Sequence, residues 1–213
     1  MSGKMDMEFV ARECQVAVDQ VSSVFALLDE GNTVPFISRY RKEKTGNLDE
    51  ERVNRVFEAY LFLKELNDRK ETILNSIASQ EKLTDHLKKR IEACFQKPDL
   101  EDLYLPFKPK KRTKASIARD MGLAPLAELL LGEADMRSPE VLAESFLNPD
   151  KGVDSLSTAV SGASHILAER FSENAELRKS LRNEIYKQAI LEVSVQKTFK
   201  DKRTKFEQYY DYR

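Results

Sequence analysis

The stretch that decides the fold is LEDLYLPFKPKKRTKASIARDMG, residues 100–122. Its first residues have the acidic and apolar pattern of a short helix, and a second helix is predicted to begin at Thr113. Pro106 and Pro109 interrupt the chain between them, because proline lacks a backbone donor and pushes the preceding residue out of the α region. We therefore expect Phe107–Lys111 to form a stiff, extended connector.

Five cations lie close together in this stretch, in what we call the basic segment (Lys108–Lys114). Lysine and arginine neutralise phosphates and release counterions, and Tyr104 and Phe107 are placed to anchor the segment on the core or to stack on bases. One interpretation is a nucleic-acid contact; the other is a solvated loop whose charges balance the acidic residues at positions 99–102. The candidate nucleic-acid-binding residues here are Lys108, Lys110, Lys111, Arg112 and Lys114.

The composition limits the class of protein. A chain of 213 residues, 41% of them hydrophobic, can build one sizeable core or two small ones. The 35 Lys and Arg residues against 36 Asp and Glu give a net charge of −1, which excludes a globally basic nucleic-acid binder but permits a local basic face. Only seven glycines and seven prolines, among many Glu, Lys, Leu and Ala, favour an all-α fold. Because we find no apolar run long enough to cross a bilayer and no signal-like segment, we expect a cytoplasmic protein without membrane contact.

Apolar periodicity and cap signals predict the helices before this stretch. Two apolar stripes predict helices from residue 7 and over residues 21–28, the second stopped by Gly31. Thr33, followed by Pro35 in the first turn, predicts the start of a short helix that ends at Gly46.

A long central helix is the next expectation. Asn47 followed by Glu50 is a capping-box variant, and it opens a helical pattern over residues 48–79, about 45 Å long. The apolar seam of this helix is interrupted by the polar residues 67–70. Such a seam indicates a different packing partner for each half of the helix.

A three-helix unit is predicted over residues 60–107. Thr84 starts one helix and Asp99 caps another, so that with the end of the long helix they have the outline of a helix-turn-helix-like insert. The first of these helices could expose cations to a nucleic-acid groove, although ordinary solubilising charge is the favoured interpretation. Its candidate residues are Lys88, Lys89 and Arg90.

The remaining helices follow the basic segment. Pro125 predicts a helix over residues 126–131, and Ser138 followed by Pro139 predicts one over residues 141–147. Two further helices are expected over residues 156–171 and 175–195. The final residues, 197–213, have no clean period.

A second basic cluster, which includes Arg39 and Arg41, precedes the long helix. In a helix, Tyr40 would point inward while Arg39 stays on the outside. A guanidinium group binds a carboxylate through two hydrogen bonds, so this cluster could join the acidic residues that begin the quoted stretch. We favour this structural role over phosphate binding. The ion-pair candidates are Arg39, Arg41, Glu101 and Asp102.

Catalytic patterns are scarce in the sequence. His86 and His165 stand apart, and neither has metal-ligand spacing with other ligand types. No glycine-rich phosphate loop or nucleophile motif occurs. Cys14 and Cys94 are too few for a disulfide framework and are interpreted as reduced, small apolar residues. We therefore expect no enzymatic activity, no metal and no cofactor.

Similarity to a known family lies in three stretches: TVPFISRYRKEKTGNLDEE (Thr33–Glu51), LEDLYLPFKPKKRTKASIARDMGLAPLAELLL (Leu100–Leu131) and ILAERFSENAELR (Ile166–Arg178). They resemble the N-terminal region of Tex, a family of transcription accessory proteins with a larger relative in eukaryotic transcription elongation. Phe107 stands where that family more often carries tyrosine.

The resemblance implies a helical N-terminal domain with a helix-turn-helix-like unit, here residues 1–196. Residues 197–213 would lead into downstream RNase-H-like, helix-hairpin-helix and S1 RNA-binding domains, and the residues suspected of catalysis would lie in the RNase-H-like domain. The implied partners are RNA or DNA, bound without sequence specificity, and the transcription machinery. The alternative is a scaffold that docks the downstream domains or the transcription machinery and touches nucleic acid little.

Overall fold

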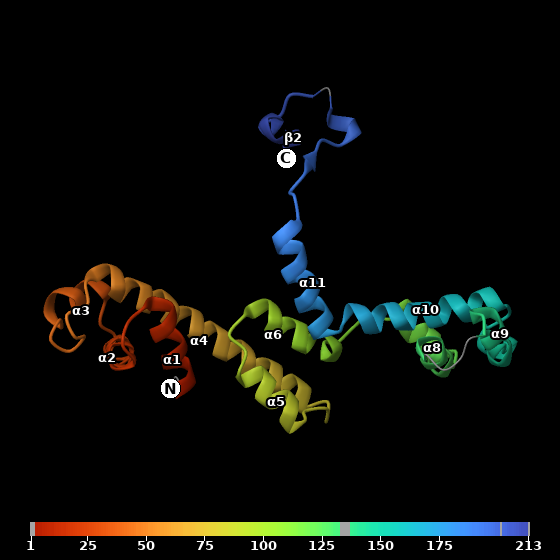
Figure 1. The fold of residues 1–213 in the computed structure, drawn as a ribbon, viewed down its shortest axis with the longest axis horizontal. Helices are drawn as coiled ribbons and strands as arrows, with labels where there is room; N and C mark the ends of the chain where they lie inside the picture. Colours follow the sequence, from red (N-terminus) through yellow and green to blue (C-terminus); the bar gives the residue numbers. More distant parts are fainter. Residues whose placement is uncertain (1–2, 133–136, 201, 213) are drawn as a thin grey trace. The chain divides into compact units, whose positions relative to one another are not determined.

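A computed structural model describes residues 3–132, 137–200 and 202–212. The fold is all-α, as the sequence predicted, and the chain forms two compact units, Met1–Leu100 and Glu101–Arg213 (Figure 1). The only strands within the described residues are β1 (Val193–Ser194) and β2 (Asp211–Tyr212), which pair antiparallel. The domain boundary expected after residue 196 stays a prediction.

The first unit is organised around one long helix, which confirms the expected central helix. This helix, α4, has 29 residues. Helices α1, α2 and α3 pack against it, and α5 lies along its C-terminal part (Figure 1). The bounds are α1 (Lys4–Cys14), α2 (Val18–Asp29), α3 (Val34–Tyr40), α4 (Glu50–Ala78) and α5 (Asp85–Glu92).

Local cap chemistry sets the predicted helix ends. Gly31 follows α2 with φ +85°, and its N–H donates to Leu28 O while the next N–H donates to Leu27 O, which closes the helix with a Schellman motif. Thr33 is the N-cap of α3, with proline in the first turn. Thr84 is the N-cap of α5. These predictions are confirmed.

The turn between α3 and α4 differs from the prediction. Helix α3 ends at Tyr40 rather than at Gly46, and the N-cap of α4 is Asp49, whose side chain accepts from a backbone N–H at 2.8 Å. Asn47 cannot serve as the cap because its φ is +61°, a left-handed conformation that asparagine tolerates better than most residues. Gln20 donates to the carbonyl oxygen of Gly46, which ties this turn to α2.

The polar interruption of α4 contains one buried residue, Lys70, and a partly buried one, Asn67, that bonds to α1. Lys70 is only 6% exposed; its Nζ donates to Glu92 O at 2.8 Å and lies 4.9 Å from the ring centroid of Phe95. Burial lowers the pKa of Lys70. Asn67 donates to the carboxylate of Asp6 in α1. The polar residues therefore join α4 to its neighbours through hydrogen bonds.

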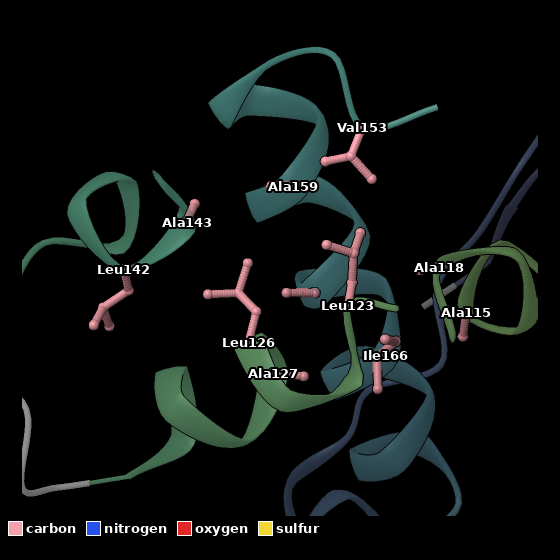
Figure 2. Close-up of a cluster of buried hydrophobic side chains, with 11 residues drawn as sticks. Ala115, Ala118, Leu123, Leu126, Ala127, Leu142, Ala143, Val153, Ala159 and Ile166 are labelled. Atoms are coloured by element: carbon pink, nitrogen blue, oxygen red, sulfur yellow. The ribbon is translucent and has the colours of Figure 1, made fainter. Parts of the chain in front are cut away.

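The second unit is built around α10. A cluster of buried side chains from α7, α8, α9 and α10 forms its core, with Leu123 and Leu126 fully buried (Figure 2). Gly162 lies in α10 where an added Cβ would meet Leu123 Cδ1 well inside van der Waals contact. The bounds are α6 (Lys97–Tyr104), which spans the boundary between the units, α7 (Lys114–Asp120), α8 (Ala124–Leu131), α9 (Pro139–Ala143), α10 (Leu156–Ser172) and α11 (Ala175–Gln188).

Several predicted ends in this region are confirmed and others are wrong. Thr113 and Ser138 are the N-caps of α7 and α9 as expected. Asp99 lies in the first turn of α6 rather than at its cap. The helix predicted to reach residue 195 ends at Gln188, because the chain becomes extended at Ala189 and then enters β1.

The three helices expected within residues 60–107 are present as the second half of α4, α5 and α6. Their helix-turn-helix-like arrangement stays a prediction. The short helix α9 is followed by a 3-10 turn, Glu144–Phe146, where the sequence predicted one continuous helix.

Candidate nucleic-acid interface

The basic segment runs between two fixed ends. A 3-10 helix, η1 (Leu105–Phe107), precedes it, and Thr113 ends it as the N-cap of α7. The sequence predicted that extended backbone begins at Phe107. In the structure Pro106 fits the first turn of η1, so extended backbone begins only at Lys108 (φ −64°, ψ 129°). From there to Thr113 the chain adopts neither helix nor strand.

Lys110 is held by the carboxylates of the protein itself. Its Nζ pairs with Glu173 Oε1 and lies 3.8 Å from Glu169 Oε1. The lysine side chain is 31% exposed and the two carboxylate side chains are 13% and 18% exposed. These carboxylates compete with a phosphate for Lys110, whose contact with nucleic acid stays a prediction. In the structure this lysine anchors the middle of the basic segment to the C-terminal end of α10.

Glu169 joins the basic segment to α7 as well. Its carboxylate accepts from Thr113 Oγ1 at 3.0 Å and from Arg119 Nη1 at 2.6 Å. Burial alone would raise the pKa of Glu169, but the hydrogen bonds from Arg119 and Thr113, together with the charge of Lys110, hold that pKa below its ordinary value. Glu169 thus ties the middle of the segment, at Lys110, and its C-terminal part, at Thr113, to α10.

These anchors were missed at the level of sequence, although a signal was present. Glu169 and Glu173 are four residues apart, and this spacing places two side chains on one face of a helix. Both lie in the stretch ILAERFSENAELR that carried the family resemblance. A pair of like charges at this spacing indicates a site for an opposite charge.

All five cations of the basic segment are exposed residues, but Lys110 alone among them pairs with largely buried carboxylates of the described chain. Arg112 Nη2 lies 4.0 Å from Asp120 Oδ2, but both side chains are more than 70% exposed, so water and salt screen this pair. Within the part of the chain that the structure describes, Lys108, Lys111 and Lys114 form no ion pair. Their contact with nucleic acid stays a prediction.

The two aromatic residues beside the segment differ in exposure. Tyr104 is buried, at 8% exposure, so it anchors the segment on the core and cannot offer a ring face to a base. Phe107 is partly buried, within η1. The anchoring role, rather than the stacking role, therefore fits Tyr104.

Asp102 is a buried ion-pair residue, but its partners are not the predicted ones. Arg178 Nε donates to Asp102 Oδ1 at 2.5 Å, and Arg182 Nη2 pairs with Asp102 Oδ2. Burial opposes ionisation, but the hydrogen bonds from both guanidinium groups hold the pKa of Asp102 below its ordinary value. The two arginines, four residues apart, fix α11 to α6 through one carboxylate. Sequence analysis had assigned this role to Arg39 or Arg41.

The cluster around α3 makes local contacts. Arg41 Nη1 donates to Tyr40 O at 3.0 Å, and its guanidinium lies 5.0 Å from the ring centroid of Phe36. Tyr40 is 62% exposed, so the prediction that it points inward is wrong; Ile37 and Ser38 form the buried face of α3. The partner expected for Glu101 from this cluster stays a prediction.

The cations of α5 form a weaker candidate interface. Lys88 Nζ lies 3.9 Å from Glu92 Oε1, one turn away, with both side chains about half exposed. Lys89 is exposed and Arg90 is partly buried. An acidic neighbour on the same helix reduces the positive potential of this face. The binding of Lys88, Lys89 and Arg90 to nucleic acid stays a prediction.

Neither a metal site nor a membrane-spanning helix occurs among the described residues. No group of three or more His, Cys, Asp or Glu side chains there is arranged to hold a metal ion. Cys14 and Cys94 are free thiols, and burial raises the pKa of Cys14. Within the same residues, no helix combines the length and the apolar character needed to cross a membrane.

Comparison with known proteins identifies two family regions. Residues 4–78 match the Tex-like protein N-terminal domain, and residues 134–213 match the family described as Tex central region-like. Protein YhgF of Escherichia coli is 45% identical over 203 residues, which cover 95% of this chain and 26% of that protein.

Two further relatives carry descriptive names. Transcriptional accessory protein Tex of Neisseria gonorrhoeae is 42% identical over 204 residues, which cover 96% of this chain and 27% of that protein. S1 RNA-binding domain-containing protein 1 of Homo sapiens is 30% identical over 164 residues, which cover 76% of this chain and 16% of that protein. The chain thus spans about a quarter of the length of these bacterial relatives.

Proposed function

Since this chain belongs to the Tex family of transcription accessory proteins, we propose that it is a non-catalytic helical module that contributes nucleic-acid binding to transcription. The names of its relatives support this class of function, because one is a transcriptional accessory protein and another contains an S1 RNA-binding domain. The proposed setting is the cytoplasm, the proposed partners are RNA or DNA and the transcription machinery, and no cofactor takes part.

The observation that carries the proposal is that the basic segment is anchored at Lys110 and exposes cations beside it. Lys110 is fixed to α10 by Glu169 and Glu173, whereas Lys111 and Arg112 beside it remain exposed. A cationic segment that is already ordered loses less conformational entropy on binding a polyanion than a free loop would. The ion pairs of Lys110 with Glu169 and Glu173 therefore support binding by its neighbours, because they hold the segment in place.

The chemistry of these contacts is that of phosphate recognition. Ammonium and guanidinium groups neutralise phosphates and release counterions, which gives affinity without reading bases. No aromatic ring face or groove-reading helix is needed for such contacts. We therefore propose binding without sequence specificity.

The test compares charge reversal in the basic segment with charge reversal elsewhere in the same unit. Lys111→Glu combined with Arg112→Glu should weaken binding of a labelled single-stranded oligonucleotide by about tenfold or more at low salt. The control, Lys151→Glu combined with Lys187→Glu, changes the net charge equally at exposed positions outside the segment. Equal loss in both variants would show a general charge effect and would contradict the proposal.

A specific observation favours the scaffold as a second candidate. Helix α11 exposes an apolar stripe at successive four-residue steps: Leu177 is 39% exposed, Leu181 is 51% exposed and Ile185 is 60% exposed. Tyr186 beside it is 90% exposed. Contiguous apolar surface of this kind marks interaction sites. The occupant we assign is the remainder of a Tex-family protein, because the relatives are about four times longer than this chain.

The scaffold is tested with the part of the Escherichia coli relative that lies outside the aligned region. Added as a separate polypeptide, it should bind this chain, and Ile185→Glu should abolish that binding while leaving oligonucleotide affinity unchanged. Binding that survives Ile185→Glu would exclude the stripe as the docking surface. Lys187→Glu on the same helix is the matched control.

A further inference from the structure

A groove with both polar and apolar lining lies between α7 and α10, at the C-terminal end of the basic segment. Its volume is about 350 Å³, and all its lining residues belong to the second unit. Five of them carry hydrogen-bonding or charged side chains: Lys114, Ser157, Thr158, Ser161 and His165.

Most of these polar groups are unused by the fold. Thr158 Oγ1 is paired with the N-cap hydroxyl of α10, at 2.9 Å. Among the described residues, the side chains of Lys114, Ser161 and His165 make no hydrogen bond or ion pair. Lys114 and Ser161 are exposed, and His165 is partly buried at one side of the groove. Donors and acceptors of this kind, gathered in one concave site, are available to a ligand.

The rest of the groove is apolar and firmly supported. Ile117 in α7 and Met121, the C-cap of α7, are both partly buried, and Gly162 lies opposite them in α10. Because Gly162 has no Cβ, Leu123 packs directly against α10 beneath this surface. A methionine thioether contacts aromatic rings favourably. The groove therefore offers a fixed apolar surface next to a cation.

Lys114 belongs to both the basic segment and the groove. Because Lys114 is two residues from Arg112, a polyanion bound along Lys111 and Arg112 can extend to the groove at Lys114. An unpaired nucleotide combines the two features that the groove matches, an anionic phosphate and a flat aromatic base. Bases in a duplex are stacked and paired, so they cannot enter such a site without being extruded.

We propose that the groove between α7 and α10 receives one unstacked nucleotide of a single strand whose backbone follows the basic segment. This inference rests on the proposed function and adds to it a preference for single-stranded nucleic acid. Lys114 and His165 contact the phosphate or sugar, and the base lies against Ile117 and Met121. Discrimination between bases is not required, because every base has an aromatic face.

The test fills the groove without changing charge. Ser161→Leu places a larger side chain in the groove, and Ser164→Leu places the same side chain on α10 outside it; both serines are exposed. Affinities of the 213-residue chain are measured by fluorescence anisotropy with labelled oligothymidylate, oligouridylate and a DNA duplex, each of roughly ten nucleotides per strand. Circular dichroism checks folding, and Ser157→Leu is the second groove variant.

We expect Ser161→Leu and Ser157→Leu to weaken single-strand binding about fivefold or more, the effect of losing one base contact. Ser164→Leu should bind as the unmodified chain does, and duplex affinity should change little in any of the three variants. Single-strand affinity unchanged in both groove variants would overturn the inference, as would equal losses on single strand and duplex. If Lys111→Glu with Arg112→Glu still weakens binding in that case, only the groove assignment fails and the proposed function stands.

Discussion

Glu169 offers the sharpest test of how the basic segment is held. Glu169→Gln keeps the shape of the side chain. It removes the negative charge that accepts hydrogen bonds from Arg119 and Thr113 and attracts Lys110. The amide also retains only one acceptor oxygen and presents an NH2 group to neighbouring donors. The variant therefore loses charge-assisted hydrogen bonds in a site where the carboxylate side chain is 13% exposed.

The magnitude follows from these contacts. A hydrogen bond to a charged group contributes about 1.5–3 kcal/mol and a neutral one about 1 kcal/mol. Arg119 is 44% exposed, so the share of its ion pair is discounted for screening, and the part-buried bond from Thr113 carries more of the effect. We expect Glu169→Gln to lower the free energy of unfolding of the second unit by about 1–2 kcal/mol at neutral pH.

The pH dependence has a definite sign. The folded pKa of Glu169 is lowered, so its stabilisation is fully present above the unfolded value of about 4.3 and is lost as the pH falls through the folded pKa. The difference between variant and unmodified chain should therefore shrink in acid. Urea titrations followed by far-ultraviolet circular dichroism measure this difference in the free energy of unfolding at neutral and acidic pH.

The matched control is Glu128→Gln. Glu128 pairs with Arg170 at 2.8 Å, but the two side chains are 67% and 51% exposed, so the loss should stay below about 0.5 kcal/mol. A Glu169→Gln chain as stable as the unmodified one at neutral pH would refute the anchoring role. So would a loss of stability that is equally large in acid.

Three further predictions concern the second unit. Asp102→Asn should speed amide hydrogen exchange in α11 about tenfold, because the carboxylate that holds this helix loses its charge; unchanged exchange would contradict the proposed link. Gly162→Ala should lower stability by about 1 kcal/mol in thermal melts, since overpacking against Leu123 outweighs the gain in helix propensity, and a stabilised variant would be contrary evidence. Glu173→Gln should leave Lys110 with only its 3.8 Å contact to Glu169 and steepen the salt dependence of single-strand binding by up to about 0.7, whereas an unchanged slope would show that Lys110 gains no phosphate contact.

The helix caps could be predicted because they depend on a few consecutive residues. Thr33, Thr84 and Thr113 each precede a helix and match its N-cap in the structure. The same reasoning chose Asn47 instead of Asp49 for α4, because two cap-forming residues stand close together there. Only the left-handed backbone of Asn47 decides between them, and that conformation depends on the preceding turn.

The ion pairs could not be predicted in the same way. Lys110 and Glu173 are 63 residues apart, and Asp102 and Arg182 are 80 apart. Charge composition gives the candidates for such pairs, but only the packing of helices selects the partners. For this reason the sequence could place the basic segment between two helices but assigned the wrong guanidinium groups to Asp102.

The burial of Lys70 shows the same limit. A run of four polar residues in α4 is as compatible with solvent exposure as with burial, because the lysine stem is apolar and its ammonium group can find partners in the interior. The backbone oxygen of Glu92 supplies that acceptor. The position of this oxygen depends on how the chain turns after α5, and this turn cannot be predicted from the hydrophobic periodicity of the sequence.

The salt dependence of single-strand binding tests the central claim most directly. The logarithm of the association constant is measured against the logarithm of salt concentration for the unmodified chain and for Lys111→Glu with Arg112→Glu. If both side chains contact phosphates, the slope should become shallower by about 1.4, or roughly 0.7 for each contact. Equal slopes would show that the exposed cations of the basic segment do not meet the nucleic acid.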